Sequence, residues 1–155
     1  MKPFPFYLVS TPIGNLDDCS ARAAETLRSV DCVLAEDTRK VRVLLDRLGI
    51  RAQVRSYHDH NQEHMTPVII REIKEGRRFA LVSDAGTPLI SDPGYLLVRR
   101  LAEEGIAITA IPGACAVTTA LVLSGLPPDR FTFYGYVPRK KRERDGLVRE
   151  AAENP

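Results

Sequence analysis

Short apolar runs alternate with amphipathic segments along most of the chain, and this alternation limits the possible folds more than any other feature. The predicted strands are Phe6 to Ser10, Cys32 to Ala35, Ala52 to Tyr57, Phe79 to Val82 and Ile106 to Ile111. The predicted helices begin near Ser20, Thr38, Thr66, Pro93 and Ala116. Strands that alternate with helices form a sheet covered on both faces. The sequence therefore predicts an α/β fold with a mostly parallel five-stranded sheet.

Chemically distinctive residues follow the predicted strands directly. They lie in the segments Thr11 to Asn15, Glu36 to Arg39, His58 to Asn61, Ser83 to Asp92 and Pro112 to Ala116. The carboxyl ends of parallel strands meet at one edge of the sheet, where ligands bind in folds of this kind. A single polar loop has a structural explanation, but five at one edge favour a binding site.

The longest of these segments belongs to the stretch LVSDAGTPLISDPG, from Leu81 to Gly94. It exceeds the usual length of a connection between a strand and a helix, which favours a binding loop. Ser91 or Asp92 is expected to cap the helix that follows, with Pro93 at its first position. The structural alternative is an elaborate turn in which Asp84 and Asp92 only cap backbone donors.

The sequence lacks the glycine patterns of dinucleotide and P-loop phosphate sites, and the GxSxG pattern of a nucleophile elbow. It offers instead small residues and prolines, against which a flat ligand can lie, and carboxylates that can accept hydrogen bonds from ribose hydroxyls. These parts fit an adenosine-containing cofactor without phosphates, and S-adenosylmethionine is the candidate.

Composition sets the remaining limits. No apolar run approaches the length needed to span a membrane, and no hydrophobic signal segment follows Met1, so we expect no membrane partner and a cytoplasmic location. Three widely spaced cysteines suggest neither disulfides nor a thiolate metal site. The 155 residues suit an α/β domain over residues 1–128, followed over 129–155 by a linker and the start of a second domain. Phe131 to Tyr134 is a candidate edge strand.

Five motifs occur in an order and at a spacing that resemble a known family. They are STPIGN (Ser10 to Asn15), AEDTR (Ala35 to Arg39), SYHDHN (Ser56 to Asn61), VSDAGTPLISDPG (Val82 to Gly94) and IPGACAV (Ile111 to Val117). The chain resembles the ribosomal RNA small subunit methyltransferase I family of the tetrapyrrole methylase superfamily. The resemblance implies a two-domain enzyme that transfers a methyl group from S-adenosylmethionine to the ribose 2′-hydroxyl of a cytidine in small-subunit ribosomal RNA.

The resemblance also implies which residues bind the cofactor. They are Pro12, Ser83, Asp84, Ala85, Gly86, Thr87, Pro88, Pro112, Ala114, Cys115 and Ala116. The family usually reads PGPSAV where this chain reads PGACAV, so a serine hydroxyl is lost at Cys115. The family's second domain is missing or only begun here, and we expect the 155-residue chain alone to be poorly active.

Methyl transfer to a hydroxyl requires removal of a weakly acidic proton. Asp37 and His58 are the candidate catalytic bases, although Asp37 is equally suited to cap the helix that begins near Thr38. The residues expected to contact RNA are Arg39, Lys40, His60, Asn61, Arg139, Lys140 and Lys141. No metal site is expected, because the closely spaced histidines lack a third ligand at a fixed spacing.

Two other functions remain open. One is methylation of a tetrapyrrole by an enzyme of the same superfamily, although a macrocycle needs a broad apolar floor. The other is a non-catalytic module that binds RNA or a protein partner. For this chain, whatever its function, a homodimer that covers exposed apolar surface is expected.

Overall fold

The computed structural model describes residues 4–153, and within this range the strands form one sheet. The strands are β1 (Phe6–Val9), β2 (Cys32–Ala35), β3 (Gln53–Ser56), β4 (Phe79–Val82) and β5 (Ile108–Ile111). Their order across the sheet is β3-β2-β4-β1-β5, and every pairing is parallel. The predicted α/β fold with a parallel five-stranded sheet is confirmed.

Helices follow the strands in alternation. They are the 3-10 helix η1 (Leu16–Asp18), α1 (Ala21–Ser29), α2 (Thr38–Arg47), α3 (Gln62–Lys74), α4 (Tyr95–Glu103), α5 (Ala116–Leu123) and α6 (Lys141–Glu153). Helix α1 begins where the sequence predicted, and Ser20 caps it, because its hydroxyl accepts a hydrogen bond from the Ala23 N–H at 3.1 Å.

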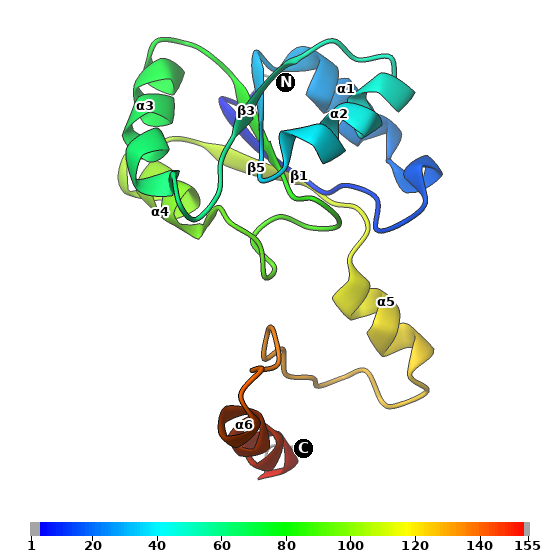
Figure 1. Ribbon diagram of the computed structural model, residues 1–155. Coiled ribbons are helices and arrows are strands. Elements are labelled where there is room, and N and C mark those ends of the chain that lie inside the picture. The colour runs from blue at the N-terminus through cyan, green and yellow to red at the C-terminus, as the bar shows by residue number, and fades with distance from the viewer. Residues whose placement is uncertain (1–3, 154–155) are drawn as a thin grey trace. The chain divides into compact units, whose positions relative to one another are not determined.

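The helices divide between the two faces of the sheet (Figure 1). Side chains alternate along each strand, so β2 sends Val33 and Ala35 to one face and Cys32 and Leu34 to the other. The first pair packs in the apolar cluster with α1 and α2, and the second pair packs with α3 and α4. All four residues of β2 are buried, which explains why this strand is a continuous apolar run.

Strand β4 lies in the middle of the sheet, between β2 and β1. Its connection leads to α4 on one face, whereas the connections of both neighbouring strands lead to α1 and α2 on the other face. Adjacent strands whose connections leave in opposite directions open a crevice at their carboxyl ends. The long loop after β4 therefore begins at the position in the sheet where this fold class binds ligands.

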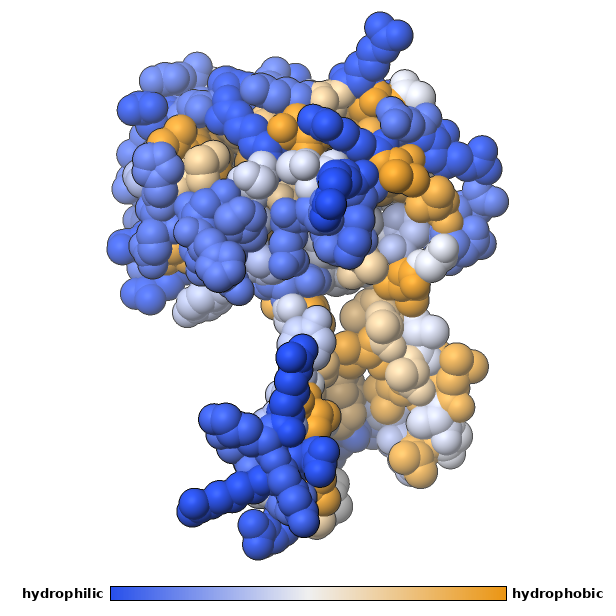
Figure 2. All heavy atoms as spheres, viewed as in Figure 1, coloured by the Kyte–Doolittle hydropathy of each residue, from blue (hydrophilic) through white to orange (hydrophobic). Residues whose placement is uncertain are grey.

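The chain divides into two compact units, Met1–Ala116 and Val117–Pro155, and each is described here by itself. The second unit contains most of α5 and all of α6. Hydrophobic residues cover α5, whereas hydrophilic residues cover α6 (Figure 2). The predicted boundary between residues 128 and 129 falls inside this second unit and stays a prediction about the domains of a longer protein.

Helix α3 begins earlier than predicted, at Gln62 instead of Thr66, so that Pro67 lies inside the helix. The reason is a turn that leads directly into the helix. The Asn61 N–H donates to the His58 carbonyl at 3.0 Å, and the Asn61 side-chain oxygen accepts from the His58 N–H at 2.9 Å. The position of Pro67 in the sequence does not predict this hydrogen-bonded turn.

Helix α4 begins later than predicted, at Tyr95 instead of Pro93. Gly94 takes the capping position with φ of 131°, a conformation that favours glycine. A Cβ atom at Gly94 would lie 2.6 Å from Leu81 Cδ2, so close packing against β4 sets the start of the helix. Ser91 has φ of 61° and does not cap the helix.

The candidate edge strand at Phe131 to Tyr134 is wrong, because these described residues form no strand. Within residues 4–153, no helix is long and apolar enough to cross a membrane.

A matched pair of valines tests the predicted core. Val33 on β2 is 0% exposed and Val43 on α2 is 59% exposed, and both substitutions to alanine remove the same atoms. We expect Val33→Ala to lower the free energy of unfolding by about 2 kcal/mol, through lost burial and a residual cavity. Val43→Ala should be neutral or slightly stabilising, because alanine has the higher helix propensity. Urea denaturation measures both, and equal effects would contradict the described sheet.

Candidate functional site

Three loops meet at the carboxyl edge of the sheet and are joined by hydrogen bonds. Thr11, just after β1, exchanges two backbone hydrogen bonds with Gly86, at 2.9 and 3.0 Å. The Thr11 hydroxyl donates to the Ser83 carbonyl at 3.2 Å, and the Ser83 hydroxyl donates to the Gly86 carbonyl at 3.0 Å. The polar groups of this buried turn are therefore paired within the protein.

The third loop, after β5, joins the other two through side chains. The hydroxyls of Ser10 and Thr87 lie 3.1 Å apart, and the Thr87 hydroxyl donates to the Ala114 carbonyl at 3.2 Å. We call residues 10–13, 83–88 and 112–116 together the loop cluster. It contains every residue that the sequence assigned to cofactor binding, and all of them belong to the first unit.

Two glycines permit the close approach of these loops. A Cβ atom on Gly113 would lie 2.9 Å from Ser10 Cβ, a distance that real Cβ atoms do not show. Gly86 has φ of +87°, and a Cβ atom there would lie 3.2 Å from Ile13 Cγ2. Small residues in the loop cluster therefore serve two purposes, since they let the loops pack and leave exposed backbone at Ala85 and Pro112.

A hollow of about 440 Å³ lies beside the loop cluster and is lined by residues that follow β2, β3 and β4. We call it the polar hollow. Its lining residues are Glu36, Asp37, Thr38, Arg39, Ser56, His58, His60 and Asp84. The structure thus brings both candidate bases together with Arg39 and His60, as the motif positions predicted.

Asp37 caps α2, and its carboxylate is fully engaged. One oxygen accepts from the Arg39 N–H at 2.9 Å and from Arg39 Nε at 3.0 Å, and the other accepts from Arg39 Nη2 at 2.7 Å. These hydrogen bonds with Arg39 lower the pKa of Asp37 far below its usual range. A carboxylate held in this state is a poor proton acceptor at neutral pH.

Asp84 links the central loop to the start of α2. One carboxylate oxygen accepts from the Asp37 backbone N–H at 3.1 Å, and the other accepts from Lys40 Nζ at 2.6 Å. The bond with Asp84 raises the pKa of Lys40, so its ammonium group stays charged. Both Asp84 oxygens are therefore used in organising the site.

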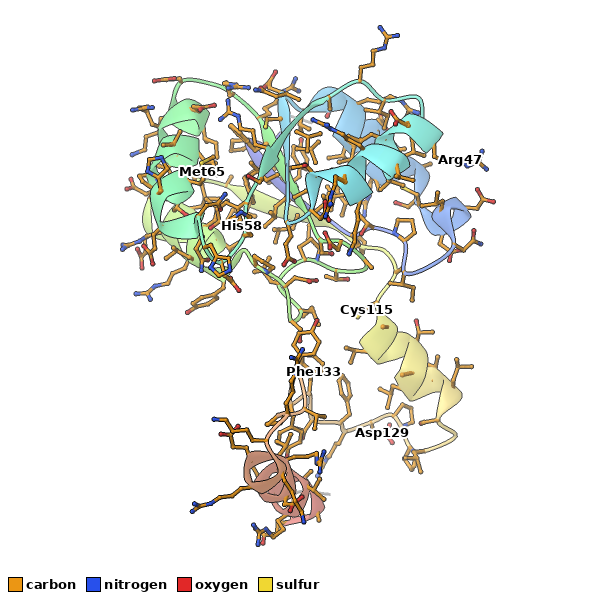
Figure 3. The ribbon with its side chains drawn as sticks, viewed as in Figure 1. Arg47, His58, Met65, Cys115, Asp129 and Phe133 are labelled. Carbon is orange, nitrogen blue, oxygen red and sulfur yellow. The ribbon has the colours of Figure 1, made fainter. Side chains whose placement is uncertain are left out.

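His58 differs from its neighbours in having an unused nitrogen. Its Nδ1 atom is buried and has no hydrogen-bond partner among the described residues. The ring lies 5.9 Å from the His60 ring in an edge-to-face arrangement, at the end of β3 (Figure 3). An unpaired buried nitrogen requires an explanation, and a binding or catalytic role is one. The Asn61 amide is used locally, because it donates to the Ser56 carbonyl at 3.1 Å.

Sequence reasoning missed two residues of this edge. Ser10 was not assigned to the site, although it begins the motif STPIGN at a strand end. Asp92 was considered only as a helix cap, but burial and the nearby charges of Glu36 and Asp84 raise its pKa. The spacing of residues along the sequence predicts neither the place of Ser10 in the site nor the charges near Asp92.

The basic residues Arg139, Lys140 and Lys141 belong to the second unit. Lys140 Nζ lies 3.2 Å from Glu143 Oε1, and both side chains are exposed. Among the described residues, no group of three or more His, Cys, Asp or Glu side chains is placed to hold a metal ion.

The model of the family described as tetrapyrrole (corrin/porphyrin) methylases matches residues 5–155. The chain belongs to this family. The resemblance inferred from the five motifs is thereby confirmed.

Several curated proteins are similar to this chain over most of its length. A protein named ribosomal RNA small subunit methyltransferase I from Haemophilus influenzae is 48% identical over 147 residues, which cover 95% of this chain and 52% of that protein. The protein of the same name from Escherichia coli O157:H7 is 50% identical over 148 residues, with the same coverage. The chain therefore spans about half the length of the curated relatives it matches.

Solved structures of methyltransferases share the fold. The crystal structure of uroporphyrin-III-C-methyltransferase from Thermus thermophilus has a TM-score of 0.58 and 25% identity, and the match covers 79% of this chain and 52% of that chain. A cobalt precorrin-4 methyltransferase has a TM-score of 0.62 at 21% identity, covering 77% and 49%. The second likeness supports the fold alone.

The titration order of two carboxyls tests the electrostatics of this edge. As the pH falls, Asp92 should take up its proton above the ordinary value of about 3.9, and Asp37 should do so below it. Because its folded-state pKa is lowered, the Asp37 ion pair stabilises the fold above about pH 3.9 and is lost as the pH falls further. Carbon-13 NMR of the carboxyl carbons measures both midpoints. Arg39→Gln should move the Asp37 midpoint upward, and an Asp37 midpoint above that of Asp92 would contradict the described contacts.

Proposed function

We propose that this chain forms the N-terminal α/β domain of an S-adenosylmethionine-dependent methyltransferase that methylates the ribose 2′-hydroxyl of a cytidine in small-subunit ribosomal RNA. The observation that carries the proposal is the match over 95% of the chain to relatives named ribosomal RNA small subunit methyltransferase I. The loop cluster and the polar hollow, side by side at the carboxyl edge, supply the two sites that such a reaction needs.

The residues of the loop cluster fit the cofactor. Exposed backbone at Ala85, Pro112 and Gly113 gives a flat nucleoside a surface without bulky side chains. When bound, S-adenosylmethionine supplies an electrophilic methyl group on a positively charged sulfur. The residues proposed to hold it are Pro12, Ser83 to Pro88, Pro112, Ala114, Cys115 and Ala116.

The polar hollow is the proposed site of the acceptor ribose. His58 is the better of the two candidate bases, because it lines the hollow and no ion pair among the described residues engages its ring, whereas Asp37 is engaged by Arg39. A neutral imidazole nitrogen can accept the hydroxyl proton as the methyl group is transferred. Asp37 then has a positioning role, since it holds the Arg39 guanidinium at the rim of the hollow.

Cationic and polar side chains around the hollow are the proposed RNA contacts. They are Arg39, Lys40, His60 and Asn61, with Arg139, Lys140 and Lys141 of the second unit. Phosphate contacts of this kind give affinity that falls as salt rises. The proposed partner is the small ribosomal subunit or its RNA in the cytoplasm, and a homodimer is proposed for the assembled enzyme.

Cofactor binding is tested by a glycine pair in a hybrid protein, in which this chain is continued by the remaining sequence of the Escherichia coli O157:H7 relative. Gly113→Ala places a Cβ atom 2.9 Å from Ser10, whereas Gly146→Ala on α6 meets nothing within 4 Å. Overpacking strain of about 1 to 3 kcal/mol, where it displaces the loop from its binding position, corresponds to about 5-fold to 150-fold in affinity. We expect calorimetry with S-adenosylhomocysteine to show this loss for Gly113→Ala alone. Unchanged affinity in both variants would remove the loop cluster as the cofactor site.

Methyl transfer to unmethylated small ribosomal subunits tests the reaction and the base. In the hybrid protein, His58→Ala should slow transfer by about 10² to 10⁴, the usual contribution of a general base, with unchanged affinity for S-adenosylhomocysteine. His64→Ala on α3 is the matched control, because it makes the same chemical change at an exposed residue outside the hollow and should leave transfer near normal. Asp37→Asn should slow transfer less than His58→Ala, because asparagine also caps helices. The 155-residue chain alone should turn over negligibly.

Three outcomes would contradict these assignments. Normal transfer by His58→Ala together with a large loss in Asp37→Asn would exchange the two roles. Methylation of a tetrapyrrole, with no transfer to ribosomal subunits, would favour the small-molecule function. Binding of RNA without any transfer by the hybrid would favour a non-catalytic module.

A further inference from the structure

Two hydroxyl groups and one carbonyl form a directed chain across the loop cluster. Thr87 Oγ1 lies 3.2 Å from the Ala114 carbonyl oxygen and 3.1 Å from Ser10 Oγ. A carbonyl oxygen only accepts, so the single hydroxyl proton of Thr87 points to Ala114. Ser10 must then donate its own proton to Thr87. The direction of both hydrogen bonds is fixed although no hydrogen position is observed.

The chain of hydrogen bonds joins loops that are far apart in sequence but follow neighbouring strands. Ser10 follows β1, Thr87 follows β4 and Ala114 follows β5, and these strands lie in the order β4-β1-β5. Ser10 and Thr87 are separated by 77 positions, and Thr87 and Ala114 by 27. The two bonds therefore fix the mutual position of loops whose strands are already paired.

Ser10 is also held firmly by its surroundings. It is 5% exposed, and its backbone N–H donates to the Ile111 carbonyl at 3.2 Å. The absent side chain of Gly113 leaves just enough room for Ser10 Cβ. Packing thus fixes Ser10, the first donor in the chain of hydrogen bonds. A group must be held in this way if it is to orient others.

We propose that Ser10 and Thr87 are positioning residues, which set the orientation of the peptide group that follows Ala114 at the cofactor edge. The proposal rests on the proposed function, because it concerns the same cofactor site. It changes the role of Thr87, whose hydroxyl is committed to the loop after β5 and does not bind the cofactor directly. It also adds Ser10, a residue outside the set implied by the family motifs.

The expected consequence concerns affinity more than folding. The loop after β5 ends at α5, and without the Thr87 bond its Ala114 carbonyl is free to turn. Sites of this kind must be held to within about 0.5 Å, and small displacements reduce binding or catalysis strongly. The alternative is a merely structural tie, in which the two hydroxyls only hold the loops together.

Substitutions at Thr87 separate the hydroxyl from the shape. Thr87→Val keeps the branched shape and removes the hydroxyl, whereas Thr87→Ser keeps the hydroxyl. Thr109→Val makes the same chemical change on β5 and serves as the control. Ser10→Ala removes the first donor and leaves Thr87 bonded to Ala114.

Two readouts are needed. The first is the carbonyl carbon-13 chemical shift of Ala114 in the 155-residue chain, which reports the hydrogen bond to that carbonyl without any cofactor. The second is the affinity of the hybrid protein for S-adenosylhomocysteine, with thermal unfolding measured in parallel. We expect Thr87→Val to move the shift and to lower affinity about tenfold or more. Thr87→Ser and Thr109→Val should leave the shift and the affinity near the unsubstituted values. Ser10→Ala should give a shift and an affinity between those of Thr87→Val and those of the unsubstituted protein.

The outcomes decide between the alternatives. If Thr87→Val moves the shift and the unfolding temperature but binds normally, the tie is structural and the proposal is overturned. The same conclusion follows if Thr87→Ser lowers the affinity as much as Thr87→Val does, because the methyl group of Thr87 then matters instead of its hydroxyl. If the unsubstituted hybrid does not bind S-adenosylhomocysteine, the proposed function fails first. The Ala114 shift of the unsubstituted chain would still report the hydrogen bond, but that bond would have no role in cofactor binding.

Discussion

Burial of strand β4 on both faces is the constraint on which the rest of the structure depends. Its four residues are buried, and its backbone pairs with β2 on one side and β1 on the other. A strand with no solvent face has no polar side chains of its own to place, so polarity begins abruptly at Ser83, where the strand ends. That abrupt change puts a polar loop over the centre of the sheet, between connections that leave toward opposite faces.

The loop after β4 is stable in this position because its neighbours satisfy its polar groups. The backbone pair between Thr11 and Gly86 extends the contact between β1 and β4 beyond the sheet. The Thr11 hydroxyl donates to the Ser83 carbonyl, and the Ser83 hydroxyl adds a second bond to the Gly86 carbonyl, which also accepts from the Thr11 N–H. The loop cluster is therefore a rigid platform, and the positive φ values of Leu89 and Ser91 lie in the segment that leads from it to α4.

The polar hollow differs from the loop cluster because ion pairs engage two of its carboxylates. Asp37 pairs with Arg39, and Asp84 pairs with Lys40, so each of these two carboxylates has a cationic neighbour on α2. Exposed pairs of this kind contribute little to stability, but they keep cations fixed at the rim where a polyanion would approach. His58 differs from both carboxylates, since its buried Nδ1 atom has no hydrogen-bond partner among the described residues.

The sequence by itself located the five strands of the sheet, mostly through short apolar runs, but it also suggested a strand at Phe131 to Tyr134 that does not form. It also placed the start of α1 near Ser20, offered Asp37 as a possible cap of α2, and placed distinctive residues at one edge, since these depend on local spacing. Tertiary structure alone decided the strand order, the starts of α3 and α4, and the bond between Ser10 and Thr87. Those features depend on the packing of segments far apart in the chain, such as Gly94 against Leu81, and local periodicity carries no information about such contacts.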